Sequence, residues 1–355
     1  MNTKTIGTVA GVGGRVDAPA SVEESDRDLF TGPGQYPARE MKVWRCSDAI
    51  AHGRGPLHVD GDFHSASFAT IHCRDAFFKR KKHWRLWLET RGSIFNRLKT
   101  PALWITDNWS CGYFHWICET LPRLVLASRF IDLREMTLLL PARAKRLPFI
   151  EESLRLFSLG RIRYLNRFER LRCDDLFLAS QVGHCGCPDF AMLDQVVDLI
   201  QAYARTGTIP ERSSPPSIGY FLRRRDAVRR RLVNEDRIAV IASKHGIEPI
   251  DAERLSWQEQ IALFSNARVL VATHGAGLVN CLAMRRGSTM VEFRDGGVKT
   301  PDCYPMLAAL MNHRFEYLRS DGSTSSGDHH RDMRVDEKKF ESILQKVTSR
   351  KVLAA

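Results

Sequence analysis

The fold of this chain is decided at residues 270–280, which read Leu270-Val271-Ala272-Thr273-His274-Gly275-Ala276-Gly277-Leu278-Val279-Asn280. An apolar run rich in β-branched residues stops at a turn of small residues, and a helix-like pattern follows. Small residues at a strand-to-helix turn let backbone N–H groups approach an anion, and the helix dipole favours the same ligand. Because a histidine stands where the anion would lie, we predict a phosphate or nucleotide-sugar site at this turn.

The two glycines of this turn have different expected roles. Gly275 would supply the tight turn, and Gly277 would let the helix pack closely or expose an N–H group. His274 could donate a hydrogen bond to a phosphate or to the glycosidic oxygen of a leaving nucleotide. The alternative is a turn of purely structural value, with His274 as a polar surface residue.

Strands and helices alternate outward from this turn. We expect strands at 103–105, 136–140, 161–165, 174–179, 218–222, 248–250, 269–272 and 289–293. Expected helices are 114–130, 148–158, 190–204, 234–245, 256–265, 277–284 and 335–347. Pro122 predicts a kink or break, and Ser256 with Glu259 predicts a capping box. The alternation indicates an α/β protein with a parallel sheet.

Composition changes along the chain suggest five parts. We expect a flexible leader over residues 1–40, an α/β domain over 41–205, and a Pro/Ser/Gly-rich linker over 206–217. A second α/β domain would follow over 218–330, with a C-terminal helix over 331–355. With 355 residues, the chain is long enough for two ordinary domains with full cores.

Nine scattered cysteines, an odd count, are most simply free thiols of a reducing cytoplasm. We identify neither a signal peptide nor an apolar segment of membrane-spanning length, and we therefore expect a cytoplasmic protein. Cys173 with His184-Cys185-Gly186-Cys187 could sketch a zinc site, but its spacing matches no standard finger. We interpret the segment as a loop with incidental thiols and expect no metal site.

A net charge of +12 predicts anionic partners. Residues 79–87 mix basic and aromatic side chains, which suits an anionic membrane face or single-stranded nucleic acid. A solvated basic edge is the plain alternative. Nucleic acid is the weakest hypothesis because it leaves the α/β rhythm and the glycine-rich turn unexplained, and we expect no nucleic-acid partner.

Two further features point to a diphosphate. Arginine presents a planar fork suited to phosphate, and in the cluster that follows strand 218–222 we favour Arg224, with Arg230 as second choice. Glu292 ends the strand after the glycine turn, at the ligand edge of a parallel sheet, where its natural partners are ribose hydroxyls. Its alternative roles are a helix cap or an ion pair with Arg268 or Arg294.

The N-terminal half offers a candidate acid–base pair. His115 and Glu119 are four residues apart, so they share one helix face and could form a general base and its orienting carboxylate. Trp109, Tyr113 and Trp116 surround them and could stack on sugar rings. The alternative is an aromatic core helix with a satisfied histidine.

Taken in order, these segments resemble glycosyltransferase family 61, which includes plant β-1,2-xylosyltransferases, extracellular O-GlcNAc transferases and bacterial capsular-polysaccharide enzymes. The resemblance covers roughly residues 104–295. It is carried by three blocks: 113–124, 221–235, and 255–292 with its His-Gly-Ala-Gly turn. The family motif usually has a serine just before its arginine, and here that position is Arg223, so donor-side geometry can differ.

The resemblance implies a GT-B-like arrangement of two Rossmann-like domains facing across a cleft. The C-terminal domain would hold the donor and the N-terminal domain the acceptor. The enzyme would be inverting and metal-independent, and we identify no Asp-x-Asp motif that would hold a metal beside the diphosphate. The implied donor-binding residues are Arg224, Arg230, His274, Gly275, Ala276, Gly277, Asn280 and Glu292, and the catalytic residues are His115 and Glu119, either of which could be the base.

The resulting hypothesis is a sugar transferase that uses a nucleotide-sugar, with UDP-sugar favoured, and a glycan or lipid-linked glycan acceptor in surface polysaccharide biosynthesis. No cofactor is expected, because the nucleotide-sugar is a substrate. Peripheral contact with an anionic inner membrane fits the basic composition. The alternative is a non-catalytic nucleotide- or glycan-binding protein of the same fold. A dinucleotide dehydrogenase is disfavoured because the turn lacks G-x-G-x-x-G spacing and comes late in its domain.

Overall fold

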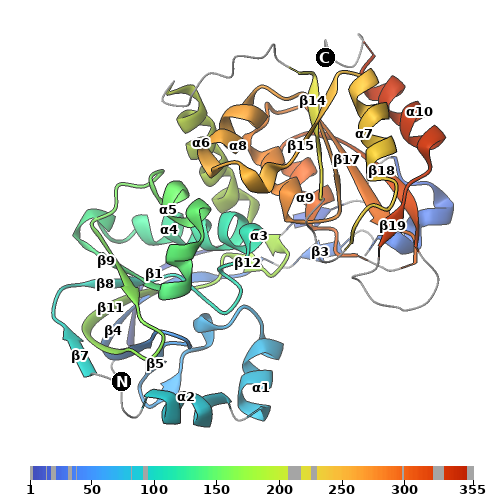
Figure 1. Cartoon of the computed structure of the whole chain (residues 1–355). Coiled ribbons are helices and arrows are strands. Elements are labelled where there is room, and N and C mark those ends of the chain that lie inside the picture. The colour runs from blue at the N-terminus through green and yellow to red at the C-terminus, as the bar shows by residue number, and fades with distance from the viewer. Residues whose placement is uncertain are drawn as a thin grey trace. The chain divides into compact units, whose positions relative to one another are not determined.

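The computed structural model describes residues 3–12, 14–16, 21–30, 34–36, 38–80, 82–90, 95–206, 217–224, 230–297, 300–322 and 332–349 (Figure 1). The chain forms two compact units. Unit 1 comprises Met1–Gly14 and Tyr36–Val196, and unit 2 comprises Arg15–Gln35 and Val197–Ala355. The sequence boundary between the two units, at Val196 and Val197, therefore falls within the helix α6 (Phe190–Arg205). Most of the predicted linker, residues 207–216, lies outside the described residues.

Unit 1 is built on a mixed sheet. Its strands are β1 (Thr3–Val9), β4 (Met41–His52), β5 (His58–Val59), β6 (Asp62–Phe63), β7 (Phe95–Leu98), β8 (Ala102–Trp104), β9 (Thr137–Pro141), β10 (Arg161–Leu165) and β11 (Arg170–Ala179), with a separate hairpin of β12 (Gly183–His184) and β13 (Cys187–Pro188). Its helices are η2 (Ser65–Ser67), α1 (Ile71–Lys79), α2 (Lys82–Thr90), α3 (Tyr113–His115), the π-helix η3 (Trp116–Thr120), α4 (Leu121–Ser128), η4 (Leu133–Glu135), η5 (Ala142–Arg146) and α5 (Pro148–Leu154), and α6 (Phe190–Arg205) runs on into unit 2.

Only half of this sheet is parallel. The strands β10, β9, β8 and β11 run parallel in that order, and β4, β5 and β6 continue antiparallel beyond β11. The parallel sheet that we predicted from the strand–helix rhythm is thus a mixed sheet in unit 1. The antiparallel strands come from the first seventy residues, which the family resemblance does not cover.

The N-terminal segment is more ordered than the predicted leader. Residues Thr3–Val9 form β1, which pairs antiparallel with β4. Residues Glu24–Leu29 form a 3-10 helix, η1, in which Asp26 is buried and accepts a hydrogen bond from Tyr317 at 2.9 Å. The strand β1 is therefore held by the sheet of unit 1, and η1 by a side chain of unit 2. The composition of this segment, which is rich in Gly, Pro and Ser and has no periodicity, did not indicate these contacts.

Unit 2 alternates strands and helices. Its main strands are β14 (Gly219–Leu222), β15 (Ile247–Ile250), β16 (Val269–Thr273), β17 (Thr289–Asp295), β18 (Arg314–Gly322) and β19 (Met333–Arg334), and β2 (Gly14–Val16) pairs with β3 (Gly34–Tyr36) at the unit boundary. Its helices are η1, α7 (Glu235–Lys244), η6 (Ala252–Arg254), α8 (Trp257–Ser265), the 3-10 helix η7 (Ala276–Ala283), α9 (Cys303–Leu310) and α10 (Glu337–Val347).

The sheet of unit 2 has a topological switch point. Its order is β15-β14-β16-β17-β18, all parallel, with β19 antiparallel at the edge. From β14 the chain passes to β15 on one side and then returns to β16 on the other. Ligands of open α/β sheets bind outside the carboxyl ends of the strands where the order reverses, which here is beyond β14 and β16.

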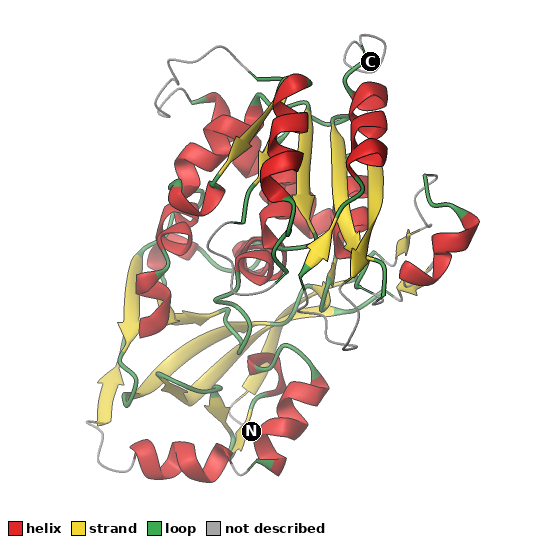
Figure 2. Cartoon of the chain, turned by 45° about the vertical axis from the view of Figure 1, so that its right-hand side comes forward, coloured by secondary structure: helices red, strands yellow, loops and turns green. Residues whose placement is uncertain are grey.

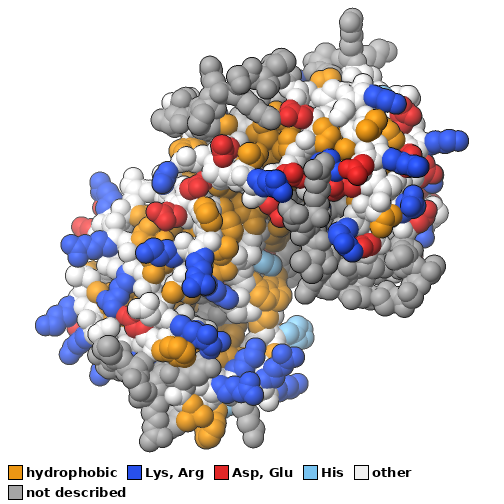
Figure 3. All heavy atoms as spheres, viewed as in Figure 1, with side chains coloured by type: hydrophobic (Ala, Val, Ile, Leu, Met, Phe, Trp, Pro, Cys, Tyr) orange, Lys and Arg blue, Asp and Glu red, His pale blue; other side chains and the backbone are white. Residues whose placement is uncertain are grey.

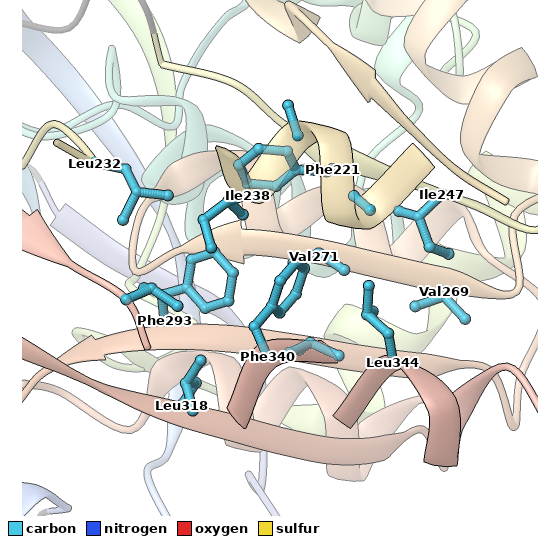
Figure 4. Close-up of a cluster of buried hydrophobic side chains, with 14 of the residues drawn as sticks. Phe221, Leu232, Ile238, Ile247, Val269, Val271, Phe293, Leu318, Phe340 and Leu344 are labelled. Carbon is cyan, nitrogen blue, oxygen red and sulfur yellow. The ribbon is translucent and has the colours of Figure 1, made fainter. Parts of the chain in front are cut away.

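Helices cover both faces of this sheet (Figure 2). On one face, Phe221 and Phe293 pack with Ile238 of α7 and with Phe340 and Leu344 of α10 in a cluster of buried side chains (Figure 4). On the other face, Tyr220 packs against Phe264 of α8. Successive strand residues point to opposite faces, so a strand covered on both faces favours apolar side chains at consecutive positions, as Tyr220–Leu222 of β14 and Val269–Ala272 of β16 have.

Local signals predicted several of these elements well. The Ser256–Glu259 capping box at the start of α8 is confirmed by reciprocal hydrogen bonds. The helix expected at 277–284 is instead the 3-10 helix η7. The region expected to be one helix from 114 to 130 is interrupted by η3, because Pro122 cannot donate to the carbonyl of Cys118 and its ring crowds that carbonyl in a regular α-helix.

Basic side chains are widely spread on the surface. Figure 3 shows Lys and Arg across the visible face of unit 1, with few acidic side chains between them. Among the described residues, no helix has both the length and the apolar character that a membrane crossing requires.

Candidate active site

The predicted turn lies at the switch point of unit 2. Parallel pairing sets Phe221 beside Val271, so β14 and β16 end at the same edge, and Arg224 and His274 both follow that edge. The structure therefore brings together these two residues, which are fifty positions apart in sequence. This is where an open α/β sheet binds its ligand.

His274 is held by a buried carboxylate. Its Nδ1 atom donates a hydrogen bond to Oε1 of Glu292, which is wholly buried. The side chain of His274 is 11% exposed, its ring packs edge-on against Tyr304 with ring centroids 4.8 Å apart, and its Nε2 makes no hydrogen bond with any described residue. The carboxylate thus fixes the ring orientation and leaves Nε2 for a ligand.

Glu292 was expected to bind the ribose hydroxyls of the donor, but its contacts in the structure are with other side chains. Its second oxygen lies 3.6 Å from Arg294, so the ion pair named as the alternative is the one that forms. Arg294 is fully buried and donates to Thr300 Oγ1 at 2.6 Å and to Asp302 Oδ1 at 3.1 Å. Phe30 covers this guanidinium, with its ring centroid 3.9 Å from Cζ. Sequence reasoning placed Glu292 at the correct edge but could not foresee its burial.

Two arginines border the same turn. Arg230 donates from Nη1 to the carbonyl of His274 at 2.7 Å. A Cβ added at Gly275 would lie 3.1 Å from Nη1 of Arg224, which shows how near that guanidinium comes to the turn. Burial, and then the charge of Arg230, lower the pKa of Arg224. Two cations held this close favour an anion between them.

Both of these guanidinium groups have unused donors. The Nε atoms of Arg224 and Arg230 are buried and make no hydrogen bond with any described residue. An unpaired buried donor is costly and calls for an explanation, and a bound anion would supply the missing acceptor for both groups. Neighbouring Arg223 differs, since Glu235 and Asp236 both pair with it. We did not predict a role for Glu235, which also accepts from the backbone N–H of Arg224 at 2.6 Å.

The small residues of the turn have separate places. Gly275 is buried, and Ala276 is exposed at the start of η7. A Cβ on Gly277 would lie 2.7 Å from Cδ1 of Leu222, so this glycine permits the close approach of η7 to β14. Asn280, which we predicted to bind the donor, is 2% exposed and donates to Oε1 of Gln260 at 3.0 Å.

Unit 1 contains the second predicted pair. His115 Nδ1 donates to Glu119 Oε2 at 2.7 Å, and the backbone N–H of Gly186 donates to the other oxygen, also at 2.7 Å. The turn of the β12–β13 hairpin brings Gly186 here with a φ of 77°. Both oxygens of Glu119 are thus occupied, and the carboxylate is held in place to orient His115.

The aromatic residues around this pair divide into two kinds. Trp109 lies against the ring of His115, with centroids 5.0 Å apart, and its residue is 38% exposed. Trp116 is wholly buried, and its Nε1 donates to Ser153, so it cannot stack on a sugar as we expected. Tyr113 packs edge-on against Phe149. Of the three, Trp109 is best placed to meet a ligand.

Cys185 lies beside His115 and Glu119, which its spacing in the sequence did not indicate. Its sulfur and the ligand atoms of His115 and Glu119 all lie within 4.8 Å of one another, so these three could in principle hold a metal. The partners we had considered, Cys173 and Cys187, are both buried free thiols. Desolvation and the charge of Glu119 raise the pKa of the Cys185 thiol.

Asp-x-Asp sequences occur elsewhere in the chain. In Asp26-Arg27-Asp28, the first carboxylate is bound by Tyr317 and Arg319. In Asp60-Gly61-Asp62, which comprises the turn after β5 and the first residue of β6, Asp60 accepts a hydrogen bond from Thr3 at 2.9 Å. Neither sequence lies in the segment of family resemblance.

Comparison with known proteins identifies the family of this chain. The sequence model of the family described as Glycosyltransferase 61 matches residues 113–291. The chain belongs to glycosyltransferase family 61. The family segment contains His115, Glu119, Arg224 and His274, and Glu292 follows directly after its end.

An animal protein is similar to a shorter part of this chain. The EGF domain-specific O-linked N-acetylglucosamine transferase of Drosophila melanogaster is 29% identical over 97 residues. This alignment covers 27% of the present chain and 18% of the relative, so most of the relative's length has no counterpart in the comparison.

Proposed function

We propose that this family 61 protein is an inverting, metal-independent glycosyltransferase. It would move a sugar from a nucleotide-sugar, with a UDP-sugar favoured, to a glycan acceptor. The observation that carries the proposal is the pair of buried, unpaired Nε donors of Arg224 and Arg230 beside His274 at the switch point. Family membership supports a nucleotide-sugar donor and a glycan acceptor in general.

The donor diphosphate would bind at the end of β14 and β16. The forks of Arg224 and Arg230 would each meet phosphate oxygens, and His274 would donate from Nε2 when protonated. Glu292 would act as a positioning residue, because its bond to Nδ1 fixes the ring. As the bond between the anomeric carbon and the diphosphate breaks, negative charge grows on the leaving oxygen and these cations stabilise it.

The acceptor would be activated by the pair in unit 1. Nε2 of His115 would accept the proton of an acceptor hydroxyl, and Glu119 would stabilise the imidazolium that results. The acceptor oxygen would form its bond to the anomeric carbon on the face opposite the departing diphosphate, which inverts the configuration. A GT-B-like arrangement, in which two domains face across a cleft, would let this step occur, and it remains a prediction from the resemblance.

The test separates donor binding from transfer. His274→Ala should reduce donor turnover by orders of magnitude with folding retained, and His115→Ala should reduce transfer about 10²–10⁴-fold while donor affinity stays close to that of the wild type. Turnover would be followed by release of the nucleoside diphosphate, and binding by a thermal-shift screen of UDP-, GDP-, CMP- and TDP-sugars with and without EDTA. His245→Ala, at the end of α7, is the matched control.

A near-normal rate in His274→Ala would remove this residue from the site, and loss of binding in EDTA would contradict the metal-independent mechanism. Donor binding without acceptor-dependent release of diphosphate would favour the alternative, a non-catalytic nucleotide- or glycan-binding protein. The role in surface polysaccharide biosynthesis, the cytoplasmic location and the peripheral membrane contact remain predictions from the sequence.

A further inference from the structure

Unit 1 has a cavity that the donor site does not use. Its volume is about 740 Å³, and its walls come from α1, α2, the ends of β8 and β9, the start of η5 and the loops at residues 53–56 and 106–109. Pockets of about 300–1,000 Å³ are typical of small-ligand sites. This one can therefore hold one or two sugar residues.

The lining of this cavity is strongly cationic. Five basic residues and one acid lie among the described lining residues: Arg54, Lys82, Arg85, Arg143, Arg167 and Asp107. Lys82 and Arg85 are exposed and form no ion pair with any described residue. The cationic side chains therefore outnumber their potential partners inside the cavity.

Asp107 does little to offset this charge. Its Oδ1 accepts from the backbone N–H groups of Trp109 at 2.9 Å and Ser110 at 3.1 Å, and its Oδ2 lies 3.4 Å from Nη1 of the buried Arg123. The carboxylate is committed to the protein's own structure. The cavity is left with a positive potential that selects an anionic ligand.

The cavity also adjoins the proposed base. Trp109 is part of its lining, and the same ring lies 5.0 Å from that of His115. Phe68 and Phe77, whose rings are 5.4 Å apart, contribute to the apolar wall. Aromatic faces beside cations suit a sugar that carries an acidic group, because the ring can stack while the acid pairs with arginine.

We propose that this cavity is the acceptor site and that the acceptor is an anionic glycan, whose carboxylate- or phosphate-bearing sugar is held by Arg85 and Arg143. A hydroxyl of that glycan would then reach His115 past Trp109. This inference rests on the proposed function, and it adds the chemical class of the acceptor.

The test is direct binding to the full chain, measured by calorimetry. Trigalacturonate should bind at least about tenfold more tightly than its methyl ester, which has the same rings without the charge. A comparison of the affinities of two single sugars, glucose 6-phosphate and galacturonic acid, would show whether the site prefers a phosphate or a carboxylate. Arg85→Ala and Arg143→Ala should each weaken trigalacturonate binding about tenfold, with circular dichroism unchanged.

Two control variants test the location. Arg155→Ala, at an exposed arginine after α5 and outside the cavity, should bind trigalacturonate as the wild type does. Arg224→Ala should also leave trigalacturonate binding unchanged, because Arg224 is not one of the residues that line this cavity. Equal affinity for the acid and the ester, or indifference to both cavity variants, would overturn the proposal.

A membrane surface is the competing partner. If phosphatidylglycerol vesicles bind through Arg85 and Arg143 while trigalacturonate does not bind, the cavity is a lipid contact and the proposal is wrong. Measuring donor binding on the same preparation separates the proposed transferase function from the proposed acceptor site. Donor binding without trigalacturonate binding would reject only this inference, whereas the reverse would reject the proposed transferase and leave an anionic-glycan site.

Discussion

Glu292 shows how burial changes the role of a single residue. From its position at the end of a parallel strand, we expected the carboxylate of Glu292 to face the ligand. In the structure it is enclosed instead, with His274 on one side and Arg294 on the other. A buried charge is stable only with partners of opposite charge or with hydrogen bonds. The same residue thus supports the predicted site from behind instead of touching the ligand.

Glu292→Gln tests this arrangement. The amide oxygen can still accept from His274, but the negative charge opposite Arg294 is lost, so we expect the free energy of unfolding to fall by about 3 kcal/mol. Urea denaturation measures the change, and donor turnover should fall with it. Glu24→Gln removes one member of an exposed pair with Arg27 and should change little. Similar stability of the two variants would contradict a structural role for the buried pair.

Asn280 and Trp116 illustrate the same limit at other positions. Their residue types suit ligand binding, and both lie in segments of family resemblance. The structure buries both and gives each a protein partner, Gln260 and Ser153 respectively. Residue type and spacing predict which groups come near a site, but side-chain direction depends on packing.

At the scale of elements, β14 lies very close to β16 and to η7, and this close approach brings their residues together at the proposed donor site. A Cβ at Gly219 would lie 2.0 Å from the carbonyl oxygen of Val269 on β16, whereas a Cβ at Gly277 would meet only the side chain of Leu222, at 2.7 Å. A backbone atom cannot move aside as a side chain can. Gly219 therefore sets how closely the two strands approach.

Gly219→Ala should consequently destabilise the protein more than Gly277→Ala. Overpacking costs about 1–3 kcal/mol, and we expect Gly277→Ala to fall within that range and Gly219→Ala to reach or exceed its upper end. Thermal and urea unfolding of the two variants side by side would measure this order. If Gly219→Ala is the milder change, the strands can separate and β14 does not have the rigid position that we infer.

Elements were predictable where their signals are local. Ser256 and Glu259 cap α8 by contacts within four residues, so the sequence alone identified that helix start. The π-helix η3 was only indicated as a kink or break at Pro122, because its geometry depends on how the flanking helices pack. Strands β1 and β4 were missed, since each is stabilised mainly by pairing with a distant partner.

At the scale of the whole molecule, buried histidines make stability depend on pH. Burial lowers the pKa of His52, in unit 1, to about 3 and that of His313, in unit 2, to about 4, from an ordinary value of 6.5. The unfolded chain binds protons below pH 6.5 and the folded one does not, so stability is full above this pH and falls as the pH drops toward the folded values.

His313→Gln should reduce this acid sensitivity. Nε2 of His313 donates to the carbonyl of Cys281 at 3.0 Å, and a glutamine amide can replace that donor without titrating. The wild type should lose up to about 3 kcal/mol through His313 between neutral pH and pH 4, and the variant should not. Urea denaturation across this range, with His245→Gln as control, measures the difference. Parallel pH profiles of wild type and variant would show that His313 is not responsible.

The sequence by itself determined the α/β class, the strand–helix order of residues 218–293, the glycine turn after β16 and the His115–Glu119 pair. Each of these is written in residues that are neighbours along the chain or one helical turn apart. Tertiary structure alone decided that Arg224 and His274 share one edge, that Glu292 lies behind the histidine, and that a cationic cavity adjoins Trp109. These depend on which strands pair and which side chains are buried, and that is set by contacts between residues far apart in sequence.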